Sequence, residues 1–476
     1  MIEERQMLIN EYVKALHDCN ASIFLGAGFS YDVFKKDWGK LLAPYAAKLG
    51  VGSTKQLNLP QVAQAYANKF SSTDLKESIS KKFISDEITK KHKLIARLPI
   101  QNYWTTNYDH LIENALNAEK KHYDKMFRND SFSSVDGTRE RIVFKCHGDC
   151  DNPESIIVTQ DDYDFYSHSS FNFVTSLLKE LATNTILFLG YSFNDPDINN
   201  LLAQVKIHNN ISNCHYLITK QEDKAVEKTK QRFWMENLER YGIQTLLVDD
   251  YYDIVVILKE IERQYMSSKV LISGSAETYA EYGNDKAAQD LISNLGYQLV
   301  EYDHEIEIIN GNGKGVGPLL YEGVAEAVAK NNLDLTKNLT IFPFSKKYYE
   351  KFEKEPSVEE QWYLYRTNMV SKCGIAFFIF GNRYNDHGEL VNAPGVRKEF
   401  EIAHQQNKYV FPIGATGYMA KELADLVLAD FEKYNGNMPN LKNILKELNT
   451  PHLPAEQIVT LVESIIDTLA YRPENK

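Results

Sequence analysis

A short apolar run leads straight into a glycine turn near the start of the chain, and this junction constrains the fold more than any other stretch. Residues 22–25 are Ser-Ile-Phe-Leu, and the turn that follows consists of Gly26, Ala27, Gly28, Phe29 and Ser30. Glycines let backbone N–H groups approach phosphate oxygens, and a helix beginning near Ser30 would point the positive end of its dipole at the same charge. The junction therefore predicts a strand, a diphosphate-binding turn and a helix. Ordinary strand-to-helix connections also contain this pattern, so its function depends on the segments described next.

Short apolar strands alternate with helical segments along the chain, and the alternation starts afresh at residue 269. A chain of 476 residues exceeds one ordinary core, and this alternation is typical of doubly wound parallel sheets. We expect an α/β protein with two Rossmann-like units in tandem, residues 1–267 and 268–476. The first helix is predicted at residues 2–18. The predicted strands are residues 22–25, 103–105, 141–145, 185–189, 215–219, 245–248, 269–272, 339–342 and 374–380.

Charge and cysteine content exclude several classes of protein. The net charge of −12 argues against broad contact with nucleic acid or with an anionic membrane. The first residues lack the basic-then-apolar order of a signal peptide, and no apolar stretch is long enough to cross a bilayer. Five scattered cysteines fit reduced thiols better than a disulfide framework. We therefore expect a cytoplasmic protein with neither nucleic-acid nor membrane partners.

Polar or glycine residues follow four of the predicted strands at the point where each strand ends. Besides the Gly26 turn, these are Asn107 with Asp109, His147, and Gly190 with Ser192. Ligands of open parallel sheets bind at the carboxyl ends of the strands, which favours a common site. Taken singly, His147 fits a structural histidine and Asp109 fits a helix cap. Their combination favours ligand contact.

These four segments resemble the motifs of the sirtuin family over roughly the first half of the chain. Residues 26–30 match its phosphate loop, residues 105–109 its asparagine motif, His147 with Gly148 its catalytic pair, and residues 190–192 its Gly-Thr-Ser turn. The resemblance implies NAD as the substrate, with Asn107 and His147 as catalytic residues. The residues that it implies for NAD binding are Gly26, Ala27, Gly28, Phe29, Ser30, Asp109, Gly190 and Ser192.

Two departures from the sirtuin pattern change the expected substrate. Sirtuin deacetylases carry a zinc ribbon with two Cys-x-x-Cys pairs, and this chain has none, so we expect no metal. Thr106 replaces the glutamine of the asparagine motif. Both changes favour cleavage of NAD itself over removal of an acyl group from lysine.

Cleavage of NAD needs few catalytic groups. Nicotinamide leaves as a neutral molecule, and the transition state resembles an oxocarbenium ion, as in glycoside cleavage. We expect Asn107 to bind the ribose hydroxyls or the attacking water. We expect His147 to be the base, because imidazole titrates near neutral pH.

The second half of the chain resembles the SLOG family, whose Rossmann-like domains bind nucleotide-derived ligands. The matching pieces are residues 273–275, 311–317, 378–382 and 394–400. Basic residues near glycine turns in an acidic protein favour a ligand pocket over a solvated helix face. No nucleophile and base are paired here, so we expect a sensor. The residues expected to bind the signal are Gly274, Ser275, Gly313, Lys314, Gly315, Arg366, Arg383, Arg397, Lys398 and Glu399.

A sirtuin-like domain followed by a SLOG domain is similar to the effector family of the bacterial Thoeris antiphage system. The resemblance implies an NAD hydrolase that a cyclic ADP-ribose isomer activates through the SLOG domain, with a TIR-domain protein as the source of that signal. It also implies a homotetramer and loss of cellular NAD during infection. Two alternatives stay open: a nucleotide-regulated protein deacylase, and a nucleotide sensor without catalysis.

Overall fold

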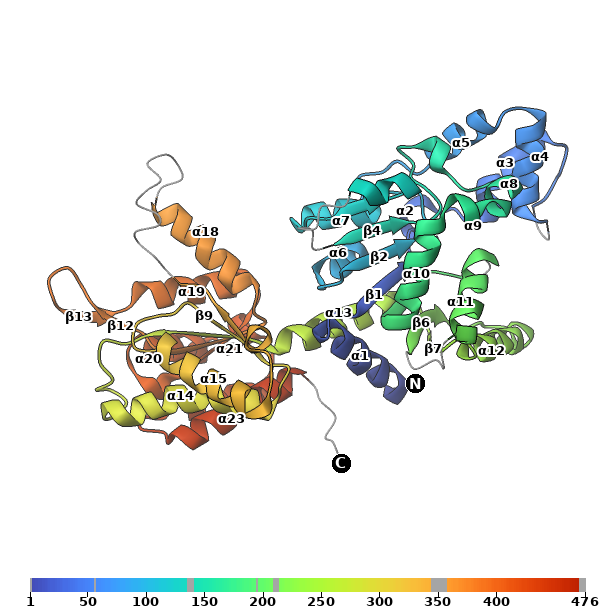
Figure 1. Cartoon of the computed structure of the whole chain (residues 1–476). Helices are drawn as coiled ribbons and strands as arrows, with labels where there is room; N and C mark the ends of the chain where they lie inside the picture. Colours follow the sequence, from blue (N-terminus) through green and yellow to red (C-terminus); the bar gives the residue numbers. More distant parts are fainter. Residues whose placement is uncertain are drawn as a thin grey trace. The chain divides into compact units, whose positions relative to one another are not determined.

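The computed structural model describes residues 2–54, 57–134, 141–193, 196–208, 214–343 and 358–470. It divides into two compact units, Met1–Glu262 and Arg263–Lys476, each built on its own parallel sheet (Figure 1). The predicted α/β class with two parallel, Rossmann-like sheets is confirmed. The two units are described separately.

A seven-stranded sheet forms the centre of the first unit, and all of its pairings are parallel. The first strand of the chain lies between the second and the fifth, so the sheet extends in opposite directions from it and the strand order reverses at that point. Such a reversal is where open α/β sheets bind ligands. Across the sheet the strands are β3 (Asp124–Met126), β4 (Ile142–Lys145), β2 (Asn102–Thr105), β1 (Ala21–Leu25), β5 (Thr185–Leu189), β6 (His215–Lys220) and β7 (Ile243–Val248).

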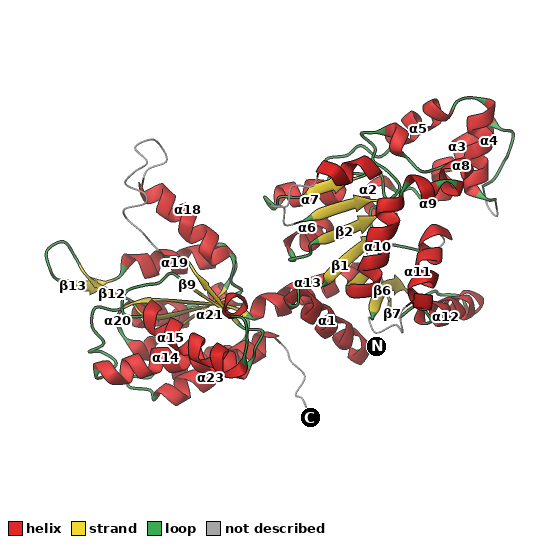
Figure 2. Cartoon of the chain, viewed as in Figure 1, coloured by secondary structure: helices red, strands yellow, loops and turns green. Residues whose placement is uncertain are grey.

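Helices lie on both sides of this sheet (Figure 2). On one face Trp104 stacks on Phe144 with ring centroids 4.0 Å apart, and Phe24, Phe188 and Phe173 pack into the same cluster. Within the described ranges, no helix is both long and apolar enough to cross a membrane. The helices are α1 (Ile2–His17), α2 (Tyr31–Phe34), α3 (Trp38–Lys48), α4 (Leu59–Lys69), α5 (Ser72–Ser80), α6 (Lys90–Arg97), α7 (Leu111–Ala118), α8 (Gln160–Asp164), α9 (Tyr166–Ser169), α10 (Phe171–Thr183), α11 (Pro196–His208), α12 (Ala225–Glu239) and α13 (Tyr252–Ser267), with 3₁₀ turns at Asn129–Ser134 and Pro153–Ser155.

The loops that follow β1 and β5 interlock through three glycines. The Gly28 amide donates to Gly190 O at 2.9 Å, and the Gly26 amide donates to Leu189 O at 3.0 Å. A Cβ on Gly26 would lie 2.4 Å from Gly190 O, and one on Gly190 would lie 2.2 Å from the Phe29 nitrogen. Gly190 also has φ +65°, which favours glycine. The glycines therefore let two backbone segments touch, whereas their sequence pattern predicts a close approach of backbone to phosphate.

The helix expected to begin near Ser30 does begin there, with Ser30 as the residue before its first turn, but it is short. α2 spans four residues and ends at Phe34, and its C-cap residue, Lys35, has the left-handed conformation with φ 51°. Because a single turn sums few peptide dipoles, α2 would contribute less to anion binding than a longer helix.

A five-stranded parallel sheet forms the second unit, with a small antiparallel hairpin beside it. The strand order again reverses, because the sheet's first strand in sequence lies between its second and its fourth. In sheet order the strands are β10 (Leu339–Ile341), β9 (Glu307–Asn310), β8 (Lys269–Ser275), β11 (Ile375–Phe380) and β14 (Tyr409–Pro412), and the hairpin consists of β12 (Asn382–Tyr384) and β13 (Leu390–Asn392). The helices are α14 (Asp285–Tyr302), α15 (Gly317–Asn331), α16 (Leu335–Asn338), α18 (Val358–Ser371), α19 (Pro394–Gln405), α20 (Tyr418–Ala429), α21 (Phe431–Asn435), α22 (Pro439–Leu448) and α23 (Ala455–Ala470), with a 3₁₀ turn at Gly414–Thr416.

The interlock of the β1 and β5 loops predicts a large cost for a methyl group at Gly190. Gly190→Ala should lower the free energy of unfolding of the first unit by about 3 kcal/mol or more, because strain at positive φ and a backbone clash add up. Gly50→Ala is the matched control: Gly50 has φ +83° and no atom within 4 Å of its Cβ position. It should cost only about 1 kcal/mol. Urea denaturation followed by circular dichroism measures both, and equal losses would contradict the interlock.

Candidate functional site

A cavity of about 1090 Å³ lies in the first unit, lined by residues that follow β1, β5 and β6 at the carboxyl edge of the sheet. Gly28, Gly190, Ser192 and Thr219 come from these three strand ends, and His147 comes from the loop after β4. Small-molecule sites usually span about 300–1,000 Å³, so the cavity can take a dinucleotide. The structure thus brings together predicted residues from three of the four sequence motifs.

Aromatic side chains form much of the cavity wall. Trp38 of α3, Tyr163 of α8, Trp234 of α12 and Tyr251 line it. Aromatic faces suit the flat bases of a dinucleotide. The sequence motifs did not predict these residues, because the segments that carry them come together only in the folded chain.

His147 is held at the cavity by a tightly packed backbone. Its carbonyl accepts a hydrogen bond from the Ile157 amide at 2.9 Å. The next residue, Gly148, has φ +90°, and a Cβ there would lie 2.2 Å from Ser155 O. The imidazole is 3% exposed and meets the Tyr163 ring edge-on at 5.6 Å. Its position is therefore fixed by the loop and by aromatic contact.

Asn107 lies against the glycine loop. Its Nδ2 donates to Gly26 O and to Ser30 Oγ, both at 3.1 Å. Its backbone amide donates to Thr105 Oγ1 at 2.9 Å, and that hydroxyl donates to Leu25 O at 2.8 Å. Within the described cavity wall, this segment contributes Thr106. The Asn107 side chain therefore ties the β2 loop to the β1 loop.

Asp109 is buried beneath the cavity loops. Its Oδ1 accepts a hydrogen bond from the Leu111 amide at 3.1 Å, at the start of α7. Burial raises the pKa of this carboxyl group, while Lys145 opposes the shift. In this arrangement Asp109 serves the helix start, which was the alternative interpretation of its position.

A fully buried lysine joins the Asn107 loop to the His147 loop. Lys145 Nζ donates to Tyr108 O at 3.0 Å and to Asp109 O at 2.6 Å, and it lies 3.1 Å from Glu113 Oε1 and 2.8 Å from Asp149 Oδ2. Burial lowers the pKa of Lys145, but the two carboxylates outweigh it and raise that pKa above its ordinary value. The ammonium group thus stays charged and bridges both loops.

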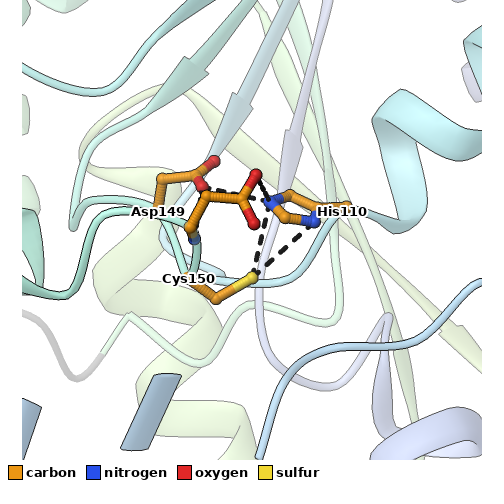
Figure 3. A group of neighbouring side chains, drawn as sticks. His110, Asp149 and Cys150 are labelled. Carbon is orange, nitrogen blue, oxygen red and sulfur yellow. Dashed lines mark hydrogen bonds and ion pairs between the residues drawn. The ribbon is translucent and has the colours of Figure 1, made fainter. Parts of the chain in front are cut away.

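Four side chains with metal-binding atoms lie together beside Lys145: His110, Asp149, Cys150 and Asp151. Figure 3 labels His110, Asp149 and Cys150. His110 Nε2 is 3.0 Å from Asp149 Oδ1, 3.2 Å from Asp151 Oδ2 and 3.4 Å from Cys150 Sγ. The hydrogen bonds that His110 makes to Asp149 and Cys150 raise the pKa of His110 to about 10, so the imidazole is protonated at neutral pH and donates to the Asp149 carboxylate. Lys125 Nζ also lies 3.0 Å from Asp149 Oδ2. Together, His110, Lys125 and Lys145 form a network of ion pairs around the Asp149 carboxylate.

The glycines expected to bind a signal interlock in the second unit. A Cβ on Gly313 would lie 2.1 Å from Gly274 O, and Gly315 has φ +73°. The Ala276 amide donates to Lys314 O at 2.7 Å. The loops after β8 and β9 therefore touch, and Ser275 ends β8 at the same edge.

A buried acid positions one arginine beside these loops. Glu399 Oε1 lies 3.3 Å from Arg366 Nε, and its Oε2 accepts a hydrogen bond from Ser273 Oγ at 2.7 Å. Burial raises the pKa of Glu399, and Ser273 and Arg366 oppose the shift. The guanidinium lies 5.7 Å from the Trp362 ring centroid and packs near Gly395.

The other predicted cations of the second unit lie apart from this pair. Lys314 pairs with Glu277, and Arg397 pairs with Glu422. Arg383 is exposed on β12, and Lys398 is exposed on α19. The structure thus links Arg366 and Glu399 to Ser273, the residue before Gly274 in β8, but it does not draw all of the predicted cations into one cluster.

Comparison with known proteins identifies relatives of both units. Residues 253–469 match the Sir2- and TIR-associating SLOG family, and residues 101–246 match the SIR2-like domain. The NAD(+) hydrolase ThsA of Bacillus cereus (strain MSX-D12) is 33% identical over 485 residues, covering 98% of each chain. The ThsA protein of Acinetobacter baumannii (strain 532279) is 33% identical over 486 residues with the same coverage. Defense-associated sirtuin 2 of Bacillus subtilis is 28% identical over 220 residues, which cover 42% of this chain and 21% of that protein. Given this similarity along nearly the whole length, the chain belongs to the ThsA family.

Proposed function

We propose that the chain hydrolyses NAD⁺ to nicotinamide and ADP-ribose in the cavity of its first unit. The observation that carries this proposal is the convergence of the His147 loop with the β1 and β5 glycine loops on one cavity. The printed name of the full-length relatives, NAD(+) hydrolase, supports the same reaction.

The reaction breaks the bond between ribose C1′ and the nicotinamide nitrogen. Nicotinamide leaves with the bonding electron pair as a neutral molecule, and a water oxygen bonds to C1′. His147 accepts the proton that this water loses. Asn107 Oδ1 accepts a hydrogen bond from a ribose hydroxyl or from the water, while its Nδ2 stays on Gly26 O and Ser30 Oγ. Ser192 and the glycine loop contact the rest of the dinucleotide.

The second unit is proposed to sense a cyclic ADP-ribose isomer. Arg366, oriented by Glu399, is the group best suited to a phosphate, because a guanidinium donates two parallel hydrogen bonds. The name of the matched family, Sir2- and TIR-associating SLOG, agrees with a TIR-domain protein as the source of the signal.

Control by a ligand suits a reaction that harms the cell. Near-complete switching from the inactive to the active state needs a differential binding free energy of about 5.5 kcal/mol. We propose that activation depletes NAD in a phage-infected cell and stops phage multiplication, and that the active assembly is a homotetramer. The name of the partial relative, Defense-associated sirtuin 2, agrees with a role in defence.

Replacing either catalytic residue should abolish NAD cleavage. His147→Ala and Asn107→Ala should each lower the rate of nicotinamide release by about 100-fold or more, because a base or a positioning amide is lost. Chromatography of NAD reactions without any acetylated peptide measures this, and release in that mixture also excludes a deacylase. His387→Ala and Asn117→Ala, at exposed positions, are the matched controls. Activity retained in both catalytic variants would contradict the assigned roles.

Arg366→Ala should remove activation by the cyclic nucleotide while NAD binding in the first unit stays unchanged. Arg366→Lys keeps the charge but loses the planar fork, so activation should be partial. The readout is the rate of nicotinamide release with increasing cyclic ADP-ribose isomer. Lys372→Ala, an exposed position just beyond α18, is the control. Unchanged activation of Arg366→Ala would move the sensing site elsewhere.

A further inference from the structure

One lysine that belongs to no recognised motif reaches the cavity beside the glycine loop. Lys91, in the first turn of α6, lines the cavity with Gly28 and Phe29. Its Nζ lies 2.8 Å from Asp32 Oδ2 and 4.9 Å from the centroid of the Phe29 ring. The Lys91 side chain is 11% exposed, whereas that of Asp32 is 61% exposed. The cation is therefore shielded, and its partner is in contact with solvent.

The glycine loop supplies less positive charge than its sequence predicts. The amides of Gly26 and Gly28 donate to carbonyls of the β5 loop, and the Phe29 amide donates to Gly26 O at 2.9 Å. The following helix, α2, is one turn long. A diphosphate in this cavity carries two negative charges, which a cation from another element would stabilise.

The remaining charges of the cavity wall point to Lys91. Among the described lining residues, the ammonium groups are those of Lys91 and Lys230. Lys230 is 68% exposed and pairs with Glu227 on its own helix at 3.0 Å. Burial, followed by the charge of Lys91, lowers the pKa of the neighbouring His92 to about 3, so that ring stays neutral. Lys91 is thus the shielded cation next to the loop.

We propose that Lys91 binds the diphosphate of the substrate by exchanging the Asp32 carboxylate for a phosphate oxygen. The inference rests on the proposed NAD⁺ hydrolysis and adds the residue that neutralises the dinucleotide. Asp32 holds the ammonium group in place before the substrate arrives. Because Asp32 is exposed, its carboxylate can turn into water when a phosphate takes its place. Asp32 therefore competes with the substrate for Lys91.

This competition gives two variants opposite effects on affinity. Lys91→Met should weaken the binding of ADP-ribose by about tenfold or more, because a charge-assisted contact is lost. Asp32→Asn should strengthen it by about two- to fivefold, because the competing carboxylate is gone. Lys91→Arg should restore most of the affinity. Lys93→Met, the matched control on an exposed lysine of the same helix that does not line the cavity, should change affinity by less than about twofold.

Isothermal titration of the full-length protein with ADP-ribose measures these affinities without turnover. Thermal midpoints confirm that each variant is folded, and Asp32→Asn with Lys91→Arg tests the idea even where Lys91→Met is unstable. A weaker affinity in Asp32→Asn would overturn the inference, because a purely structural ion pair predicts that sign. An unchanged affinity in Lys91→Met would overturn it as well.

Turnover separates this inference from the proposed function. In NAD assays Lys91→Met should raise KM and leave kcat within about twofold, whereas loss of the base lowers kcat. If the wild-type protein binds ADP-ribose with the predicted variant pattern but releases no nicotinamide, the proposed function fails and the Lys91 site stands. If the wild-type protein binds no ADP-ribose, the Lys91 site fails.

Discussion

The contacts of the buried Lys145 ammonium group are the interactions on which the rest of the first unit depends. It contacts the carbonyls of Tyr108 and Asp109 on one loop and the carboxylate of Asp149 on the other. An unpaired charge at this depth would cost several kcal/mol, so the two loops are stable only together. These two loops carry Asn107 and His147. Because both loops contact the Lys145 ammonium group, that group fixes the positions of Asn107 and His147 relative to each other. The interlocked glycines of the loops after β1 and β5 fix another part of the cavity wall.

Periodicity and composition predicted nine of the twelve described strands of the two parallel sheets, because buried parallel strands are continuous apolar runs. The strands β3, β9 and β14 were not predicted. The strand at residues 185–189 has the predicted bounds, and the helix predicted at residues 2–18 ends at His17. The loop contacts were not predictable in this way. A Gly-x-Gly sequence reads alike whether its amides face phosphate or a second backbone, and only the position of Gly190 decides. Lys145 did leave a signal, since a charged residue ends an otherwise apolar strand.

Each unit contains an ion pair that matters for its proposed ligand, Lys91 with Asp32 in the first and Arg366 with Glu399 in the second. The two acids differ in burial. The Asp32 side chain is 61% exposed, whereas that of Glu399 is 11% exposed and also bonded to Ser273. An exposed carboxylate can leave its partner at little cost, and a buried one cannot. The first arrangement suits a site that must admit and release ligand in each turnover. The second suits a site in which a guanidinium keeps one orientation.

The four tryptophans lie where their fluorescence can report on ligand binding. Trp38 and Trp234 border the cavity of the first unit, and Trp362 lies beside Arg366 in the second. Trp104 is sealed in the sheet core against Phe144. Indole fluorescence changes with stacking and polarity, so bound bases in the first unit and a bound nucleotide in the second would each quench a different emitter. The sealed indole would supply a constant internal reference for both signals.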